Sequence, residues 1–317
     1  MDYTTLGRTG LRVSVAGLGC GGASRLGRAY GKSFEESVAV VQEAIDLGIS
    51  FIDTAIVYRT EDIVGAAIKG KRDKLVLSSK AWVIRDGAGL HDLDFCSNTQ
   101  LVERVESSLK QLGTDYIDVY HLHGVTAEQL PYSLAEFVPT LERLREQGKI
   151  RFIGITERFI SDTKHDAFRL AVEQDCWDVM MVGFNFLNPS ARRTVLAKTQ
   201  EKNIGTLDMF AVRRALSKPK ALRETLKIAV KAGQLDRSVL KGDVLGFLLK
   251  DGGASSLQEA AYRFCRHEPG IDIVLTGTGS RERLRENVAS INMGPLPPPH
   301  LARLEELFGA VDSISGN

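Results

Sequence analysis

The chain has 317 residues, of which 43% are hydrophobic and 26% are charged, and its formal net charge at pH 7 is +1. This composition is typical of a globular protein with a large core, and it excludes a disordered chain and a basic footprint for nucleic acid or an anionic membrane. Its partners are therefore expected to be small molecules.

The four cysteines lie far apart, at Cys20, Cys96, Cys176 and Cys265, and they show no CxxC or Cys/His ligand spacing. No metal site is predicted. The N-terminal segment MDYTTLGRTG has no apolar run of the secretory type, and no segment approaches the length that crosses a bilayer. We therefore expect a cytoplasmic location with reduced thiols.

Strand and helix patterns alternate along the chain. A hairpin is predicted around 4–13, and short apolar runs typical of buried strands then alternate with amphipathic stretches typical of helices. The predicted strands are 13–19, 49–55, 74–82, 116–124, 150–156, 178–187, 205–211 and 271–277. The predicted helices are 34–48, 61–70, 98–113, 134–149, 166–174, 191–203, 256–267 and 281–291, with an irregular, partly helical insertion at 212–253.

Eight β/α units at this length favour a (β/α)8 TIM barrel with an N-terminal β-hairpin and extra C-terminal helices. No Pro/Gly/Ser-rich linker divides the chain, so one barrel domain over 1–317 is predicted. The alternative is an open sheet of the Rossmann type. That fold needs a GxGxxG turn after the first strand, and LGCGGASRLG at 18–27 does not supply it.

Titratable side chains gather at the predicted carboxyl ends of three neighbouring strands. Asp53 and Tyr58 follow the second strand, Lys80 lies in the third and His123 ends the fourth. Taken singly, each is more often a turn former, a packed ring or a solvated charge than a catalytic group. Because strand ends of a barrel face one opening, their coincidence favours a shared catalytic site.

Lys80 follows VLSS in a strand that is expected to be buried, so its ammonium needs a partner, and Asp53 can supply one. An ammonium beside the hydroxyl of Tyr58 is expected to lower the phenol's pKa, which is about 10 in free tyrosine. Tyr58 then becomes an acid that works near neutral pH. His123 is placed to hydrogen-bond the same substrate oxygen.

The segments GISFIDTAIVY, VLSSKAW and IDVYHLHG resemble the catalytic segments of the aldo-keto reductase superfamily, and the likeness runs from LGRTGLRVSVAGLG to RERLRENV. The resemblance implies a barrel that reduces carbonyl compounds with NAD(P)H. It also implies that Tyr58 is the general acid, that Lys80 lowers its pKa, that Asp53 holds Lys80 and that His123 orients the carbonyl.

The same resemblance places the cofactor along LTGTGSRERLRENV, at 275–288. Arg283 lies where the family often meets the 2′-phosphate, which favours NADP(H) over NAD(H). Without the resemblance, a capped, Arg-rich surface helix is an equally good interpretation. The expected contacts in and around this segment are Gly277, Thr278, Gly279, Arg283, Glu286 and Asn287.

Several positions depart from the family pattern. Thr156 and Glu157 replace a Ser-Asn pair that binds the nicotinamide carboxamide, Met181 replaces a Gln, and Met209 replaces a Tyr that stacks on the ring. Glutamate cannot donate a hydrogen bond as an amide does, so the nicotinamide is expected to be held differently. Further expected cofactor contacts are Cys20, Gly21, Asp53, Phe210, Ala211, Arg213 and Arg214, with the two arginines as candidates for the pyrophosphate.

The expected substrate pocket contains Tyr58, Trp82 and His123, with help from the loop 84–95. His121 is expected to face the same side as His123, either to tune specificity or as a packed ring. The predicted activity is NADPH-dependent reduction of an aldehyde or ketone, or oxidation of the corresponding alcohol. Two alternatives remain at this stage: a Schiff-base lyase that uses Lys80, and a nucleotide-binding regulatory barrel with little turnover.

Overall fold

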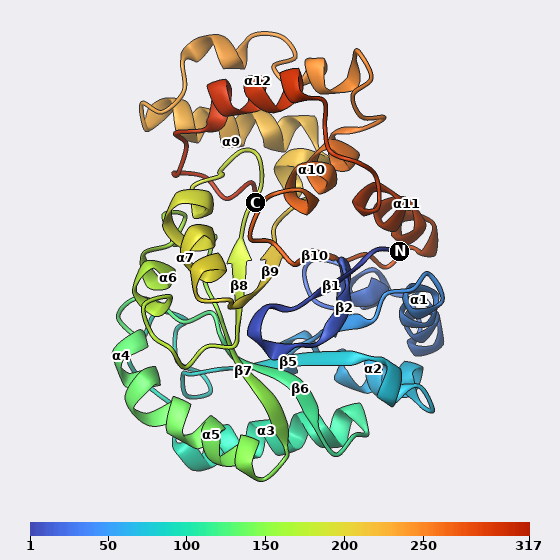
Figure 1. The fold of residues 1–317 in the computed structure, drawn as a ribbon, viewed down its shortest axis with the longest axis vertical. Helices are drawn as coiled ribbons and strands as arrows, with labels where there is room; N and C mark the ends of the chain where they lie inside the picture. Colours follow the sequence, from blue (N-terminus) through green and yellow to red (C-terminus); the bar gives the residue numbers. More distant parts are fainter.

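The computed structural model describes residues 1–317, and its strands form a closed, parallel barrel in the order β10-β3-β4-β5-β6-β7-β8-β9. Helices surround the strands in Figure 1. The predicted (β/α)8 architecture is confirmed. The barrel strands are β3 Ala16–Gly19, β4 Phe51–Asp53, β5 Val76–Trp82, β6 Ile117–His123, β7 Ile150–Thr156, β8 Val179–Gly183, β9 Gly205–Met209 and β10 Ile273–Thr276.

The helices of the β/α repeat follow the predicted order along the chain. They are α1 Phe34–Asp46, α2 Glu61–Ile68, α3 Asn98–Leu112, α4 Leu130–Tyr132, α5 Val138–Glu146, α6 Asp166–Ala171, α7 Ala197–Glu201, α10 Leu257–Arg266 and α11 Arg281–Ile291. The insertion after β9 forms α8 Arg214–Ser217 and α9 Pro219–Lys231, and the predicted extra C-terminal helix is α12 Pro298–Phe308. In Figure 1, α9 and α12 lie at the top of the view, beyond the carboxyl end of β8.

The predicted hairpin is present and seals the amino end of the barrel. Its strands, β1 Tyr3–Thr5 and β2 Arg12–Ser14, pair antiparallel. Leu6 and Val13 are fully buried in one cluster with inward-facing strand residues such as Phe51. The chain predicted as one strand at 13–19 is therefore divided, because β2 belongs to the hairpin and only β3 enters the barrel.

The barrel has an outer and an inner core. The outer core of 73 buried residues lies between the strands and the helices, whereas the inner cluster contains 9. Towards the carboxyl ends of the strands the buried side chains become polar, with Asp53, Ser78, Lys80 and His121 all nearly inaccessible. In TIM barrels this is the end that carries active sites.

Two of the predicted elements have different bounds for an identifiable structural reason. β8 stops at Gly183 rather than 187, because Asn185 and Asn188 turn to donate side-chain hydrogen bonds to the carbonyls of Ser315 and Ile314. The helix predicted from 134 begins already at Leu130 and passes through a π-helical turn, Ser133–Phe137, before α5. Pro139 explains the irregular turn, since it has no N–H to continue the regular α-helical ladder.

No helix combines the length and the apolarity that a membrane span requires.

One glycine inside the barrel is needed for close packing. A Cβ on Gly154 would lie 2.2 Å from Nδ1 of His121, the residue that pairs with it across β6 and β7. Gly154→Ala is therefore expected to destabilise the protein by about 1–3 kcal/mol through overpacking. The measurement is the urea unfolding midpoint.

Gly294→Ala is the matched control, because a Cβ there would meet nothing within 4 Å. Adding His121→Ala to Gly154→Ala removes the clashing ring and is expected to recover part of the loss. Equal stability of the Gly154→Ala and Gly294→Ala proteins would show that the barrel accommodates the extra carbon without strain.

Candidate active site

A buried ion pair joins the ends of β4 and β5. Nζ of Lys80 donates to both carboxylate oxygens of Asp53, at 2.6 and 2.7 Å, and to the carbonyl of Thr54 at 2.9 Å. The hydroxyl of Ser78 donates to Asp53 at 2.8 Å. Three acceptors thus use all three donors of the ammonium. The sequence prediction that Asp53 partners Lys80 agrees with this geometry.

In the pair of Lys80 and Asp53, the amine of Lys80 stays protonated. Burial lowers the pKa of Lys80, but Asp53 and Tyr58 raise it, so the pKa lies above the usual value for lysine. A charge this deep in the barrel needs such compensation. Lys80 is therefore a fixed cation rather than a free amine.

Tyr58 stands beside this cation. It ends a short 3-10 helix, Ile56–Tyr58, and Nζ of Lys80 lies 5.0 Å from the centroid of its ring. The ring fits against Gly21, where a Cβ would lie 2.5 Å from Cε2 of Tyr58. The expected lowering of the phenol's pKa is wrong in its net direction. Burial raises the pKa of Tyr58, and this outweighs the lowering by Lys80.

His123 and Trp82 complete the rim next to Tyr58. The rings of Tyr58 and His123 are perpendicular with centroids 5.7 Å apart, and Trp82 lies 6.1 Å from His123. Burial, together with the charges of Lys80 and Arg158, holds the pKa of His123 well below its usual value, so the ring is neutral. His121 faces the same side, fully buried, and neither ring nitrogen has a partner in the protein.

Glu157 does not point into the opening as an amide replacement would. Its carboxylate meets Nδ1 of His165 at 2.9 and 3.0 Å and accepts the backbone N–H of Gly183 at 2.7 Å. Both side chains are fully buried. Neighbouring Thr156 accepts the N–H of Gly124 on its hydroxyl at 2.7 Å, which leaves the hydroxyl hydrogen free to donate.

The residues predicted at the ends of β8 and β9 lie at different depths. Met181 belongs to the inner apolar cluster and is only 2% exposed, whereas Met209 is partly exposed above it. Arg213 lies 4.1 Å from the ring centroid of Phe210, and both Nε and Nη2 donate to Oδ1 of Asn317. Of the other predicted contacts, Cys20 and Ala211 are buried, and Arg214 is exposed at the start of α8.

The turn between β10 and α11 brings two backbone segments together at the N-terminus of α11. Gly277 is exposed, and a Cβ on Gly279 would lie 2.4 Å from Cα of Gly27, so two backbones meet there. Ser280 caps α11, and the hydroxyl of Thr278 accepts the N–H of Ser280. Of the other predicted contacts, Arg283 and Glu286 are exposed, while Asn287 donates to Thr276.

Arg158, which lies two residues beyond β7, is not among the predicted site residues. Its side chain packs over Gly124, the residue after His123, and its Nε is buried without a partner. The available signal was its place just past a strand's carboxyl end, where barrel active sites gather. What the sequence did not reveal is the direction of the side chain.

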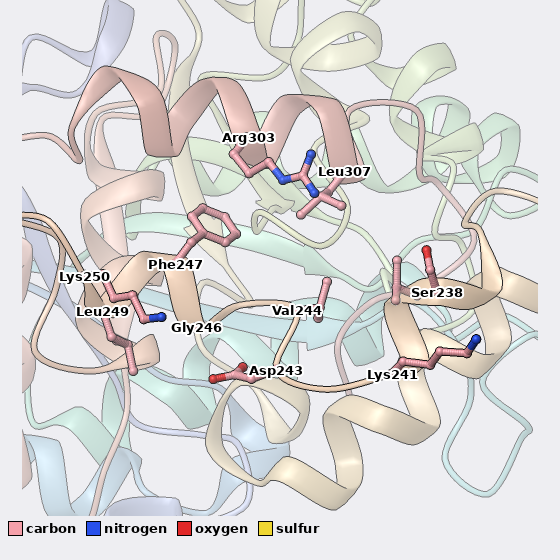
Figure 2. A pocket seen from close by; sticks show the side chains of 11 residues that line it. Ser238, Lys241, Asp243, Val244, Gly246, Phe247, Leu249, Lys250, Arg303 and Leu307 are labelled. Carbon is pink, nitrogen blue, oxygen red and sulfur yellow. The ribbon is translucent and has the colours of Figure 1, made fainter.

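A cavity lies away from this site. It has a volume of about 740 Å³ and lies between the segment 238–250 and α12, lined among others by Phe247, Arg303 and Leu307 (Figure 2). None of the predicted site residues borders it. Its walls carry no part of the chemistry described above.

Comparison with known proteins agrees with the geometry. A family model described as "Aldo/keto reductase family" matches residues 18–308. Two proteins of Bacillus subtilis (strain 168) are similar to this chain. "Aldo-keto reductase YhdN" is 31% identical over 307 residues, which cover 90% of this chain and 88% of that protein. "Uncharacterized oxidoreductase YqkF" is 28% identical over 309 residues, which cover 96% of each.

A solved structure titled as an aldo/keto reductase from Klebsiella pneumoniae in complex with NADP and acetate shares the fold. Its TM-score is 0.68 at 22% identity, and the alignment covers 97% of this chain and 96% of that one. The family match spans most of the barrel and includes the strand ends that carry Asp53, Tyr58, Lys80 and His123. The chain belongs to the aldo/keto reductase family and is an oxidoreductase, as the strand-end motifs predict.

Proposed function

We propose that this chain is an NADPH-dependent reductase of aldehydes or ketones in which Tyr58 gives the proton to the carbonyl oxygen. The observation that carries the proposal is the cluster at the ends of β4, β5 and β6, where the buried Lys80–Asp53 pair lies under Tyr58 and opposite His123. This cluster offers two hydrogen-bond donors to one substrate oxygen.

The proton belongs on the phenol before the reaction. Burial raises the pKa of Tyr58, so the hydroxyl is protonated at neutral pH and acts as a donor. As the substrate oxygen gains negative charge, the fixed ammonium of Lys80 stabilises the phenolate that forms. His123 is neutral, and a neutral imidazole with a protonated Nε2 can donate to the same oxygen.

The residues near β9 and β10 suit a dinucleotide with phosphate groups. Arg213 and Arg283 have no carboxylate partner, and the N-terminus of α11 follows the turn Gly277–Gly279. Helix N-termini and arginines both favour phosphate. When bound, NADPH supplies the hydride to the carbonyl carbon. The Klebsiella pneumoniae structure, described as a complex with NADP, supports this choice of cofactor.

Thr156 is the group best placed to donate to a carboxamide, because its hydroxyl hydrogen is free. Glu157 contributes through the backbone instead, since it fixes the N–H of Gly183 and the ring of His165. This arrangement replaces the amide contacts that the family pattern supplies at these positions.

Tyr58→Phe tests the proton donor. The phenylalanine keeps the ring against Gly21 but removes the hydroxyl, so kcat for aldehyde reduction is expected to fall by about 10²-fold to 10⁴-fold. Binding of NADPH, measured by fluorescence quenching, is expected to survive. Turnover close to that of the parent protein would remove Tyr58 from this role.

Arg283→Ala tests the cofactor. Arg283 is exposed and makes no ion pair, so its loss is expected to leave the fold intact. Charge-assisted bonds to phosphate predict that the KM for NADPH rises about tenfold or more, while the KM for NADH changes little. Comparable increases for both cofactors would rule out a 2′-phosphate contact.

Borohydride separates the reductase from the Schiff-base lyase. Lys80 is protonated and all three of its donors are occupied, so it has no free lone pair for attack on a carbonyl. No mass increase at Lys80 is expected after incubation with an aldehyde and borohydride. A reduced adduct on Lys80 would favour the lyase, and tight NADPH binding without turnover of any aldehyde would favour a regulatory barrel.

A further inference from the structure

Arg158 lies on a hydrogen-bonded turn beside the candidate active site. Its own carbonyl accepts the N–H groups of Ser161 and Asp162, at 2.9 and 2.8 Å, which fixes the backbone after β7. The side chain lies along Gly124, where a Cβ would be 3.3 Å from the guanidinium carbon. Gly124 has φ +60°, a left-handed conformation that glycine adopts without strain. The turn therefore fits the arginine against the end of β6.

No acidic side chain neutralises this arginine. Glu157, the preceding residue, is committed to His165 and Gly183, and both carboxylate oxygens of Asp162 cap α6 through the N–H groups of Asp166 and Ala167. Arg158 makes no salt bridge, and its Nε is buried without a partner. Burial lowers the pKa of Arg158, and no negative group raises it. Partial burial of an unpaired guanidinium costs desolvation free energy, and a bound ligand with a negative charge would offset that cost.

Arg158 lies near the residues expected to contact the substrate and far from those expected to contact the phosphates of the cofactor. Gly124 follows His123 directly, and the charge of Arg158 acts on the ring of His123. β6 lies opposite β10 in the strand order of the closed barrel, four strands away in either direction. Arg283 and the turn before α11 are therefore on the far side of the opening from Gly124.

We propose that Arg158 binds the carboxylate of the substrate, so that the preferred substrates are aldehydes or ketones that also carry a carboxylate group. The planar fork of an arginine matches two carboxylate oxygens, and while Nε of Arg158 is buried, its two Nη nitrogens have no partner in the protein and remain open to such a contact. This inference rests on the proposed reductase function. The carboxylate takes no part in bond making: hydride adds to the carbonyl carbon, Tyr58 passes its proton to the oxygen, and the carboxylate keeps its charge.

The charges around His123 also favour an anionic ligand. Lys80 and Arg158 bring two positive charges close to His123, and Asp53 is the acid that pairs with Lys80. His123 stays neutral in this field. An unpaired positive charge beside the reacting groups attracts anionic ligands and discriminates against cations.

Matched aldehydes test the inference. The ratio of kcat/KM for 4-formylbenzoate to that for its methyl ester measures the preference for a carboxylate at one fixed geometry, and the ratio for 4-oxobutanoate to butanal measures it in a flexible substrate. At least one ratio is expected to be about 10 to 100 in the parent protein, as a charge-assisted pair predicts. Arg158→Met is expected to bring that ratio close to 1, and Arg158→Lys to an intermediate value.

Arg169→Met is the charge-matched control. Arg169 is exposed on α6, so this substitution removes one positive charge outside the opening. It is expected to leave both ratios unchanged. Ratios close to 1 for both substrate pairs in the parent protein would overturn the inference, as would a preference that persists in Arg158→Met. A preference that falls equally in Arg169→Met would assign it to net charge alone and overturn it too.

A binding measurement separates failure of this inference from failure of the proposed function. Terephthalate carries carboxylates but no reducible carbonyl, so its effect on the melting temperature in the presence of NADPH needs no turnover. The parent protein is expected to be stabilised and Arg158→Met is not. If terephthalate raises the melting temperature of the parent protein but not that of Arg158→Met, the carboxylate site is supported even if no aldehyde is reduced. If the parent protein reduces aldehydes but its melting temperature does not change with terephthalate, the inference is wrong and the proposed function stands.

Discussion

The buried pair of Lys80 and Asp53 is the constraint on which the rest of the site depends. An ammonium with no access to water is stable only if its donors are satisfied, and here two carboxylate oxygens and the carbonyl of Thr54 do so. Because the partners come from two adjacent strands, the register of β4 on β5 sets the position of Nζ. Removing either partner alone would leave a buried charge, at a cost of about 3–5 kcal/mol.

That fixed charge determines the protonation of its neighbours. It stands 5.0 Å from the ring centroid of Tyr58 and lowers the phenol's pKa, yet burial acts more strongly in the other direction. It also helps to keep His123 neutral. The resting site therefore holds a protonated phenol and a neutral imidazole above a permanent cation. Such a site stabilises negative charge that develops on an oxygen and does not need to rearrange for it.

The sequence was sufficient for features that depend on pattern. Alternating apolar runs and amphipathic stretches predicted the barrel, and the polar ends of three strands predicted that Asp53, Lys80 and His123 face one opening. Features that depend on depth or on side-chain direction were not predictable. The net pKa of Tyr58 follows from how completely its ring is covered, and the pairing of Glu157 with His165 follows from a left-handed backbone at His165, φ +60°, that no local signal indicates.

The departures at β7 are consistent with one another once these contacts are known. A Cβ on Gly183 would lie 2.1 Å from the ring of Phe159, and that ring stacks on His165 with centroids 5.0 Å apart. Glu157 joins the same unit by accepting the N–H of Gly183 and meeting His165. In the proposed enzyme, these side chains form a rigid wall rather than a set of amide donors.

With Glu157 turned into this wall and Met181 buried, Thr156 is the side-chain donor that the proposed function assigns to a nicotinamide on this side of the opening. If the proposed cofactor binds here, fewer polar contacts to its ring make the affinity depend more on its phosphate groups, for which Arg213 and Arg283 are the proposed partners. Contacts with phosphates depend on charge and weaken as salt screens them. The same wall engages the carboxylate of Glu157, so the acid next to Arg158 in the sequence does not pair with its guanidinium.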